Sequence, residues 1–256
     1  MATTYLDLTN ELLREMNEVV LTSSNFADAL GVQAHVKDCV NRAYLDIVLE
    51  EPQWPFLSVG ESGSTDPFYG NVVVETVANQ RWYELKASSD SLSDDYGYVD
   101  WDDFYITTIG VSGETAPYVS ENLRYITLEQ WKDYHRSQEN ADDAEDANGG
   151  QPRRVFRSSD GRNFGLSPIP DKVYRIHFFA FNQATQLSAY GDEIVFPDVY
   201  KTVLLARARY YVHQFKENIQ PAALALEDYR RGLRLMKNAL MMPSPDYIKD
   251  DRMRLV

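Results

Sequence analysis

The sequence contains little cysteine and no long apolar run, and these absences narrow the classes of protein it can encode. Among 256 residues Cys39 is the single cysteine, which excludes an internal disulfide and a cysteine-based zinc cluster. No stretch approaches the roughly 18 consecutive apolar residues that a membrane-spanning helix needs. Residues 1–10 also lack the basic start and apolar run of a secretory signal. We therefore expect a soluble protein of a reducing compartment.

Catalytic motifs are missing as well. The four histidines (His35, His135, His177 and His213) never occur at HxxH or HxxxH spacing, and no GxSxG elbow, P-loop or GxGxxG is present. Two acidic runs, at 94–103 and 142–146, do not match the EF-hand spacing. We expect no enzyme activity, no catalytic residue, no metal site and no cofactor, although calcium binding by the acidic runs stays open.

Positive charge is scarce and unevenly placed. The chain holds 25 Lys and Arg against 39 Asp and Glu, a net charge of −14 that makes tight binding to a phosphate backbone a poor prospect. The first 147 residues carry the whole acidic excess, and the remainder is mildly basic. Such asymmetry fits stacking between copies or two solvated faces of a monomer. For the first interpretation, the predicted subunit-interface residues are Arg207, Arg230 and Arg234.

Apolar periodicity predicts helices at both ends of the chain. Leu8 to Val20 and roughly 33–50 form the first predicted pair, and 199–217 and 224–240 form the second. A capping box at Thr4–Asp7 marks the first start. Because each pair has only an apolar stripe to bury, we expect both pairs to share one four-helix bundle.

The middle of the chain changes to a strand pattern rich in Val, Ile, Thr and aromatics. A second capping box, at Thr127–Gln130, opens a short predicted helix to about Ser137. The fold class is therefore α+β: a four-helix bundle with a large antiparallel β-rich insertion. Predicted strands are 71–77, 81–86, 104–111, 153–157, 163–166 and 173–181. Predicted parts are the helix pair 1–56, the insertion 57–193, the helix pair 194–242 and an extended tail 243–256.

Two further features carry residue-level predictions. Trp54 and Phe56 flank Pro55 where the second helix ends, and we expect both rings to anchor the first helix pair. The tail follows Pro243 and Pro245, which cannot continue a helix. Its apolar and basic residues alternate with acids, a pattern typical of a segment that orders on contact with a partner. The predicted docking residues are Tyr247, Ile248, Arg252, Arg254 and Leu255.

Four stretches in this order resemble the head-to-tail adaptor proteins of tailed bacteriophages, which include the tail tubular protein A type. They are 41–47 with the exit Trp54-Pro55-Phe56-Leu57, LSPIPDKVY at 166–174 before a strand, GDEIVFPDVY at 191–200, and the leucine-bearing helix 229–235. The acidic stretches 88–103 and 141–150 are not part of the resemblance.

The resemblance implies a structural virion protein, assembled in the host cytoplasm. It implies a ring, usually of twelve copies, between the portal and a tail or second neck protein, with DNA passing through without specific binding. A different class remains open: a carbohydrate-binding or tail-fibre-associated module that uses the aromatic and acidic β segment. An acid-based hydrolase is a third alternative. The sequence does not identify the phage, the tail-side partner or the face that lines the channel.

Overall fold

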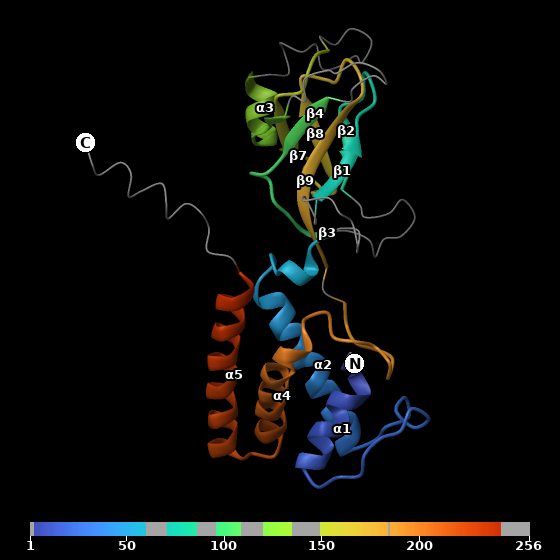
Figure 1. Ribbon diagram of the computed structural model, residues 1–256, viewed down its shortest axis with the longest axis vertical. Coiled ribbons are helices and arrows are strands. Elements are labelled where there is room, and N and C mark those ends of the chain that lie inside the picture. Colours follow the sequence, from blue (N-terminus) through green and yellow to red (C-terminus); the bar gives the residue numbers. More distant parts are fainter. Residues whose placement is uncertain are drawn as a thin grey trace, which may run out of the picture. The chain divides into compact units, whose positions relative to one another are not determined.

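The computed structural model describes residues 3–59, 71–85, 96–108, 120–134, 149–183 and 185–241. The chain divides into two compact units, each treated separately below. The helical unit comprises Met1–Phe56 and Ala184–Val256, and the β unit comprises Leu57–Gln183. Helices and mixed sheets together make an α+β fold, as the sequence predicts (Figure 1).

Helices from both ends of the chain build the helical unit. Its four helices are α1 (Tyr5–Glu15), α2 (Val32–Glu50), α4 (Lys201–Phe215) and α5 (Ile219–Leu240). Helix α4 contacts both α5 and α2, and α1 contacts α2 and, to a smaller extent, α4 (Figure 1). Their buried faces carry the periodic apolar residues, so burying these stripes against one another is what brings the two ends of the chain together.

Helix α1 begins where the capping box predicts and ends earlier than the periodicity predicts. Thr4 Oγ1 accepts a hydrogen bond from the Asp7 backbone N–H, and the Asp7 carboxylate accepts one from the Thr4 backbone. The helix stops at Glu15 because Asn17 adopts a positive φ of 57°. Val19 and Val20 are exposed, so the prediction that they extend the apolar face is wrong.

The segment before α4 belongs to the helical unit. The β unit therefore ends ten residues before the predicted boundary at 193. Tyr5 and Leu6 donate backbone hydrogen bonds to the carbonyls of Asp192 and Tyr190, and Leu187 donates one to the Asn41 side chain. The Asp192 carboxylate in turn accepts bonds from the backbone of residues 188 and 189. These contacts tie 187–193 to α1 and α2, so the unit boundary follows residue 183.

Two sheets form the β unit. The first has the order β1 (Asn71–Glu75), β9 (Tyr174–Asn182), β4 (Tyr105–Thr108), β5 (Ser120–Asn122), and β3 (Tyr96–Val99) also pairs with β9. The second has the order β2 (Trp82–Glu84), β8 (Asn163–Ser167), β7 (Arg154–Arg157), β6 (Arg124–Tyr125).

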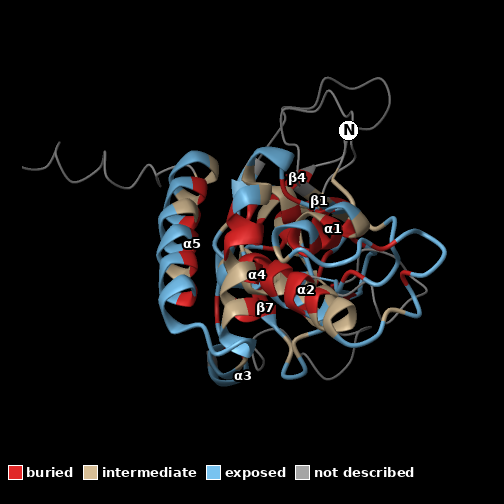
Figure 2. Ribbon diagram, turned by 90° about the horizontal axis from the view of Figure 1, so that it is seen from below, coloured by how far each residue is buried: buried red, intermediate tan, exposed pale blue. Residues whose placement is uncertain are grey.

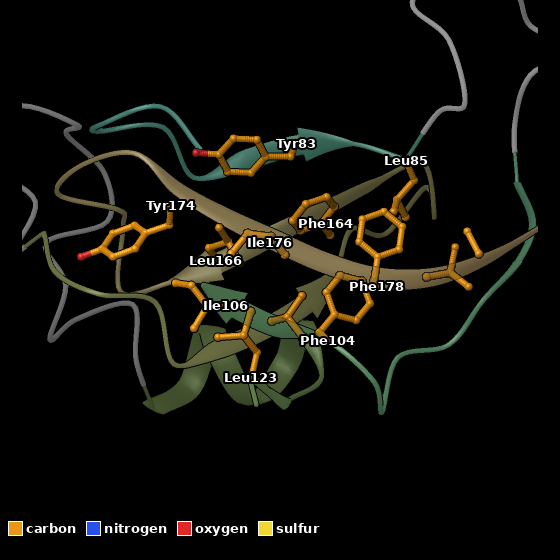
Figure 3. Close-up of a cluster of buried hydrophobic side chains, with 13 residues drawn as sticks. Tyr83, Leu85, Phe104, Ile106, Leu123, Phe164, Leu166, Tyr174, Ile176 and Phe178 are labelled. Carbon is orange, nitrogen blue, oxygen red and sulfur yellow. The ribbon is translucent and has the colours of Figure 1, made fainter. Parts of the chain in front are cut away.

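The core of the β unit is a stack of aromatic rings between these sheets (Figure 3). Alternate residues of β9, including Ile176 and Phe178, face inward, as expected for a strand with one buried face. Phe104 stacks on Phe178 at 4.7 Å between ring centroids and meets Phe164 edge to face at 5.7 Å. Aromatic pairs in these geometries add stability beyond the area that they bury.

The insertion is not purely antiparallel, which corrects the sequence prediction. Strand β6 pairs with β7 in parallel, and α3 (Leu128–Tyr134) lies between them in the chain, as is usual for parallel neighbours. The predicted capping box of α3 is confirmed, since Thr127 and Gln130 exchange backbone-to-side-chain hydrogen bonds. Strands β3, β5 and β6 were not predicted, because β3 lies in the acidic stretch 88–103 and β5 and β6 consist mostly of polar residues.

Candidate interaction surfaces

Paired charges join the N-terminal helices of the helical unit to its C-terminal helices. Arg207 on α4 donates a hydrogen bond through Nε to Asp46 Oδ2 on α2 at 2.7 Å, and the hydroxyl of Tyr211 donates to the same oxygen. The Arg207 guanidinium also lies over the ring of Tyr229 at 4.9 Å from its centroid. Burial alone would lower the pKa of Arg207, but the hydrogen bond and charge of Asp46 outweigh it and raise that pKa.

Three more cations repeat this arrangement. Each cation belongs to α4 or α5, and each acid belongs to α1 or to the end of α2, as in Lys201 with Glu11 at 3.4 Å. The same pattern holds for Arg209 with Glu15 and for Lys237 with Glu50 and Glu51. Part of the opposite charge of the two halves of the chain is therefore neutralised within one copy.

The structure separates the three predicted interface arginines. Arg207 is turned into the helical unit and paired with Asp46, so it is not a free surface cation. Arg230 and Arg234 are exposed on α5, together with their neighbour Arg231. The predicted docking residues Tyr247, Ile248, Arg252, Arg254 and Leu255 lie outside the described residues, and their role stays a prediction.

The two predicted anchors lie in an aromatic cluster at the end of α2. Trp54 is fully buried, donates through Nε1 to the Ile47 carbonyl at 3.0 Å and stacks on Phe56 at 5.2 Å. Phe56 lies 5.9 Å from Phe196, which stacks on Tyr44 at 6.1 Å. These rings connect the exit of α2 to the segment that leads into α4.

In the β unit, the aromatic and acidic segment contributes to a pocket of about 250 Å³. Tyr96, Tyr98 and Trp101 line it together with Arg157 and Arg162. The Trp101 ring is held by stacking on Phe104 at 5.3 Å. Its neighbour Asp103 has a raised pKa, because burial and the nearby charge of Asp100 both disfavour its ionised form.

The residues with catalytic potential do not form a catalytic set where the structure describes them. Cys39 Sγ lies 3.4 Å from His35 Nε2 beside a groove between α2 and α4, but burial raises the pKa of the thiol to about 11. At neutral pH the thiol therefore stays protonated, which is the weakly reactive form. His177 stacks flat against Tyr105 at 4.6 Å and hydrogen-bonds Thr107 Oγ1 at 2.9 Å.

The described ranges contain neither a candidate metal site nor a candidate membrane-spanning helix. No group of three or more His, Cys, Asp and Glu residues there could hold a metal ion. No helix there is long and apolar enough to cross a membrane. The acidic run at 142–146 lies outside the described residues, so its calcium binding is not tested.

Sequence reasoning missed Asp46, the acid on which Arg207 and Tyr211 converge. It lies between the buried residues Tyr44 and Ile47 on α2, and an acid at the margin of an apolar face is a signal for a half-buried partner. The apolar periodicity of α2 does not show this acid as a partner, and the charge asymmetry of the chain instead predicted a partner for Arg207 in another copy.

Comparison with known proteins gives one family. A search of curated proteins finds no match to the chain. The model of the SU10 adaptor protein family matches residues 3–248, which include both units and nearly the whole chain. The matched range contains all four of the resembling stretches. The chain therefore belongs to the family of SU10 adaptor proteins, which are bacteriophage adaptor proteins.

Proposed function

We propose that this protein is the head-to-tail adaptor of a tailed phage. Copies form a ring, twelve by the resemblance described above, between the portal and a tail or second neck protein, and packaged DNA passes through the ring. The family match over 3–248 is the observation that carries the proposal. The net charge of −14 supports it, since an acidic channel protein lets DNA slide without holding its phosphates.

The C-terminal tail is the proposed portal-docking element. The described part of α5 ends at Leu240, and the residues that follow carry Tyr247, Ile248, Arg252, Arg254 and Leu255. A segment of this composition cannot bury enough apolar surface alone and gains order on contact with a partner. In the ring, each tail would reach the portal rim or the neighbouring copy.

The proposal is tested with purified protein and purified portal rings, analysed by native mass spectrometry and electron microscopy. We expect a complex that contains one ring of each protein, and loss of that complex when 244–256 are deleted. Failure of the full-length protein to bind the portal under any condition would contradict the adaptor role. Binding by the truncated protein at full occupancy would contradict only the role of the tail.

A carbohydrate-binding role is the second candidate, and the pocket of the β unit favours it. Tyr96, Tyr98 and Trp101 supply ring faces, and Arg157 and Arg162 supply donors, a combination suited to a polar ligand with apolar edges. A glycan array followed by titration of any hit tests this role. Trp101→Ala should abolish a specific response, and an empty array would rule the role out for the glycans tested.

A further inference from the structure

Helix α5 presents two different faces. Its inner face packs on α4, and the two helices approach closely because Gly232 leaves room for Val203, whose Cγ2 would lie 2.9 Å from an added Cβ. The outer face carries the exposed side chains of Leu224, Arg231 and Leu235. Figure 2 shows α5 exposed on the side away from α4. At 100° per residue these three positions fall within one narrow stripe, opposite the buried Tyr229.

Arg230 and Arg234 both lie on one side of that stripe and are also exposed. Among the described residues, the side chains of these two arginines and of Arg231 make no ion pair or hydrogen bond, unlike the cations that join α4 and α5 to α1 and α2. The outer face of α5, defined here by Leu224, Arg230, Arg231, Arg234 and Leu235, therefore carries three cations and two apolar side chains. The exposed acids Glu227 and Asp228 lie on the same side of the helix, so three positive charges face two negative ones and a small basic excess remains. We call this face the basic edge.

A second edge of the helical unit has the opposite charge. It consists of 16–31, between α1 and α2, and 185–193, before α4, and we call it the acidic edge. The two segments meet at the buried Tyr5, whose ring contacts Phe26 at 5.0 Å and whose backbone N–H bonds to the Asp192 carbonyl at 2.8 Å. Four acids and no Lys or Arg occur in them: Glu18, Asp28, Asp192 and Glu193.

The acidic edge also exposes apolar side chains. Leu30 is 82% exposed, Val19 is 75% exposed and Tyr190 is 50% exposed. Figures 1 and 2 show its segments on the side of the helical unit away from α5, with α4 and α2 between them. One unit thus has a basic, apolar edge and an acidic, apolar edge on opposite sides.

We infer that the helical units of successive copies associate through these edges, with the outer face of α5 against the acidic edge of the next copy. The occupant of each edge is a second copy of this chain, because identical copies placed side by side bring opposite charges and exposed apolar groups together. Such a contact is heterologous, and heterologous contacts close into rings when the rotation between copies permits. The inference rests on the proposed ring and names the surfaces that would form it.

The two kinds of side chain have different roles in this contact. Leu224 and Leu235 would lose water against Val19 and Leu30, which supplies binding free energy. The arginines would direct the approach of the acidic edge and disfavour contact between two basic edges. The cations paired within one copy, such as Arg207, take no part.

The test uses the full-length protein with Arg230→Glu, Arg231→Glu and Arg234→Glu combined, and native mass spectrometry as the readout. Under conditions in which the wild-type protein forms rings, alone or on portal rings, we expect this variant to stay monomeric with unchanged helicity. A matched control combines Arg124→Glu, Arg153→Glu and Arg157→Glu, exposed arginines of the β unit, which change the net charge equally. We expect the control to form rings.

A charge swap gives the second arm. Glu18→Arg, Asp28→Arg and Glu193→Arg, added to the α5 variant, should restore rings because both edges are then reversed. Rings formed by the α5 variant as readily as by the wild type would overturn the inferred contact and leave the proposed ring intact. A wild-type protein that forms no ring even on portal rings would overturn both, so the two failures are distinguishable.

Discussion

The helical unit is assembled from the two ends of the chain, whereas the β unit is assembled from one continuous segment. In the helical unit, ion pairs such as Glu11–Lys201 and Asp46–Arg207 join residues that are distant in sequence. In the β unit, stacked rings such as Phe104 and Phe178 form the core. Because partly exposed ion pairs stabilise little, we expect these pairs to favour one arrangement of the helices more than to add stability.

The strongest test of this comparison is to remove one large buried ring from each unit. Trp54→Ala should lower the free energy of unfolding of the helical unit by about 3 to 5 kcal/mol, because a fully buried side chain is lost. Phe104→Ala should have an effect of the same order in the β unit. Hydrogen exchange measured by mass spectrometry should show lost protection only in the unit that carries the change. Equal loss of protection in both units after either change would contradict the expectation that the two units unfold separately.

A second test adds volume rather than removing it. At Gly165 in β8, an added Cβ would lie 2.5 Å from the ring of Phe156, so Gly165→Ala should cost about 1 to 3 kcal/mol. Gly191 in the helical unit has no atom within 4 Å of an added Cβ, which makes Gly191→Ala the matched control. Urea unfolding measures both. A neutral Gly165→Ala would show that the β unit adapts more easily than its ring stacking indicates.

A third test compares one ion pair from each unit. Asp46–Arg207 is mostly buried, with the two side chains 30% and 20% exposed, and we expect a double-mutant cycle with Asp46→Asn and Arg207→Met to give about 1.5 kcal/mol. Glu75–Arg175 is about half exposed and should give less than about 0.5 kcal/mol. Equal coupling energies would mean that the difference in burial does not change the strength of the two ion pairs.

The smallest expected effect is the change that follows protonation of the Asp192 carboxyl at low pH. Backbone N–H donors at Ser188 and Ala189, with the Ser188 hydroxyl, lower the pKa of Asp192. A carboxyl whose folded pKa is lowered stabilises the fold above its ordinary pKa, about 3.9, and this contribution is lost as pH falls through the lowered value. The amide shifts of residues 188 and 189 should therefore titrate below pH 3.9. A midpoint at or above 3.9, or the same titration in Asp192→Asn, would contradict this cause.

Local signals in the sequence predict the helices and most strands well. The capping boxes at Thr4 and Thr127 and the apolar period of residues 33–50 depend only on neighbouring residues, and the structure confirms them. Strands β3, β5 and β6 could not be predicted, because they lie in acidic or polar stretches without a strand pattern and are defined by their partners. The parallel β6–β7 pair depends on the same long-range contact.

The candidate surfaces were harder to predict, because charge counts do not show direction. Arg207 and Arg230 both follow from the basic character of the last helices, yet one meets Asp46 and the other faces outward. The two residues differ in whether they lie on the side of their helix that packs against the other helices or on the side that faces outward. The pocket beside Trp101 likewise combines three segments of the β unit that lie far apart in the sequence.

Strand β9 also sets an order of events during translation. It pairs with β1, β3 and β4, so the first sheet cannot close until the ribosome has made residue 182. Helix α4 is made later still, and until then α1 and α2 have no partner for much of their apolar surface. The β unit can thus fold while the nascent N-terminal helices still lack their partner α4. During that interval the apolar faces of these helices are most exposed to chaperones and to aggregation.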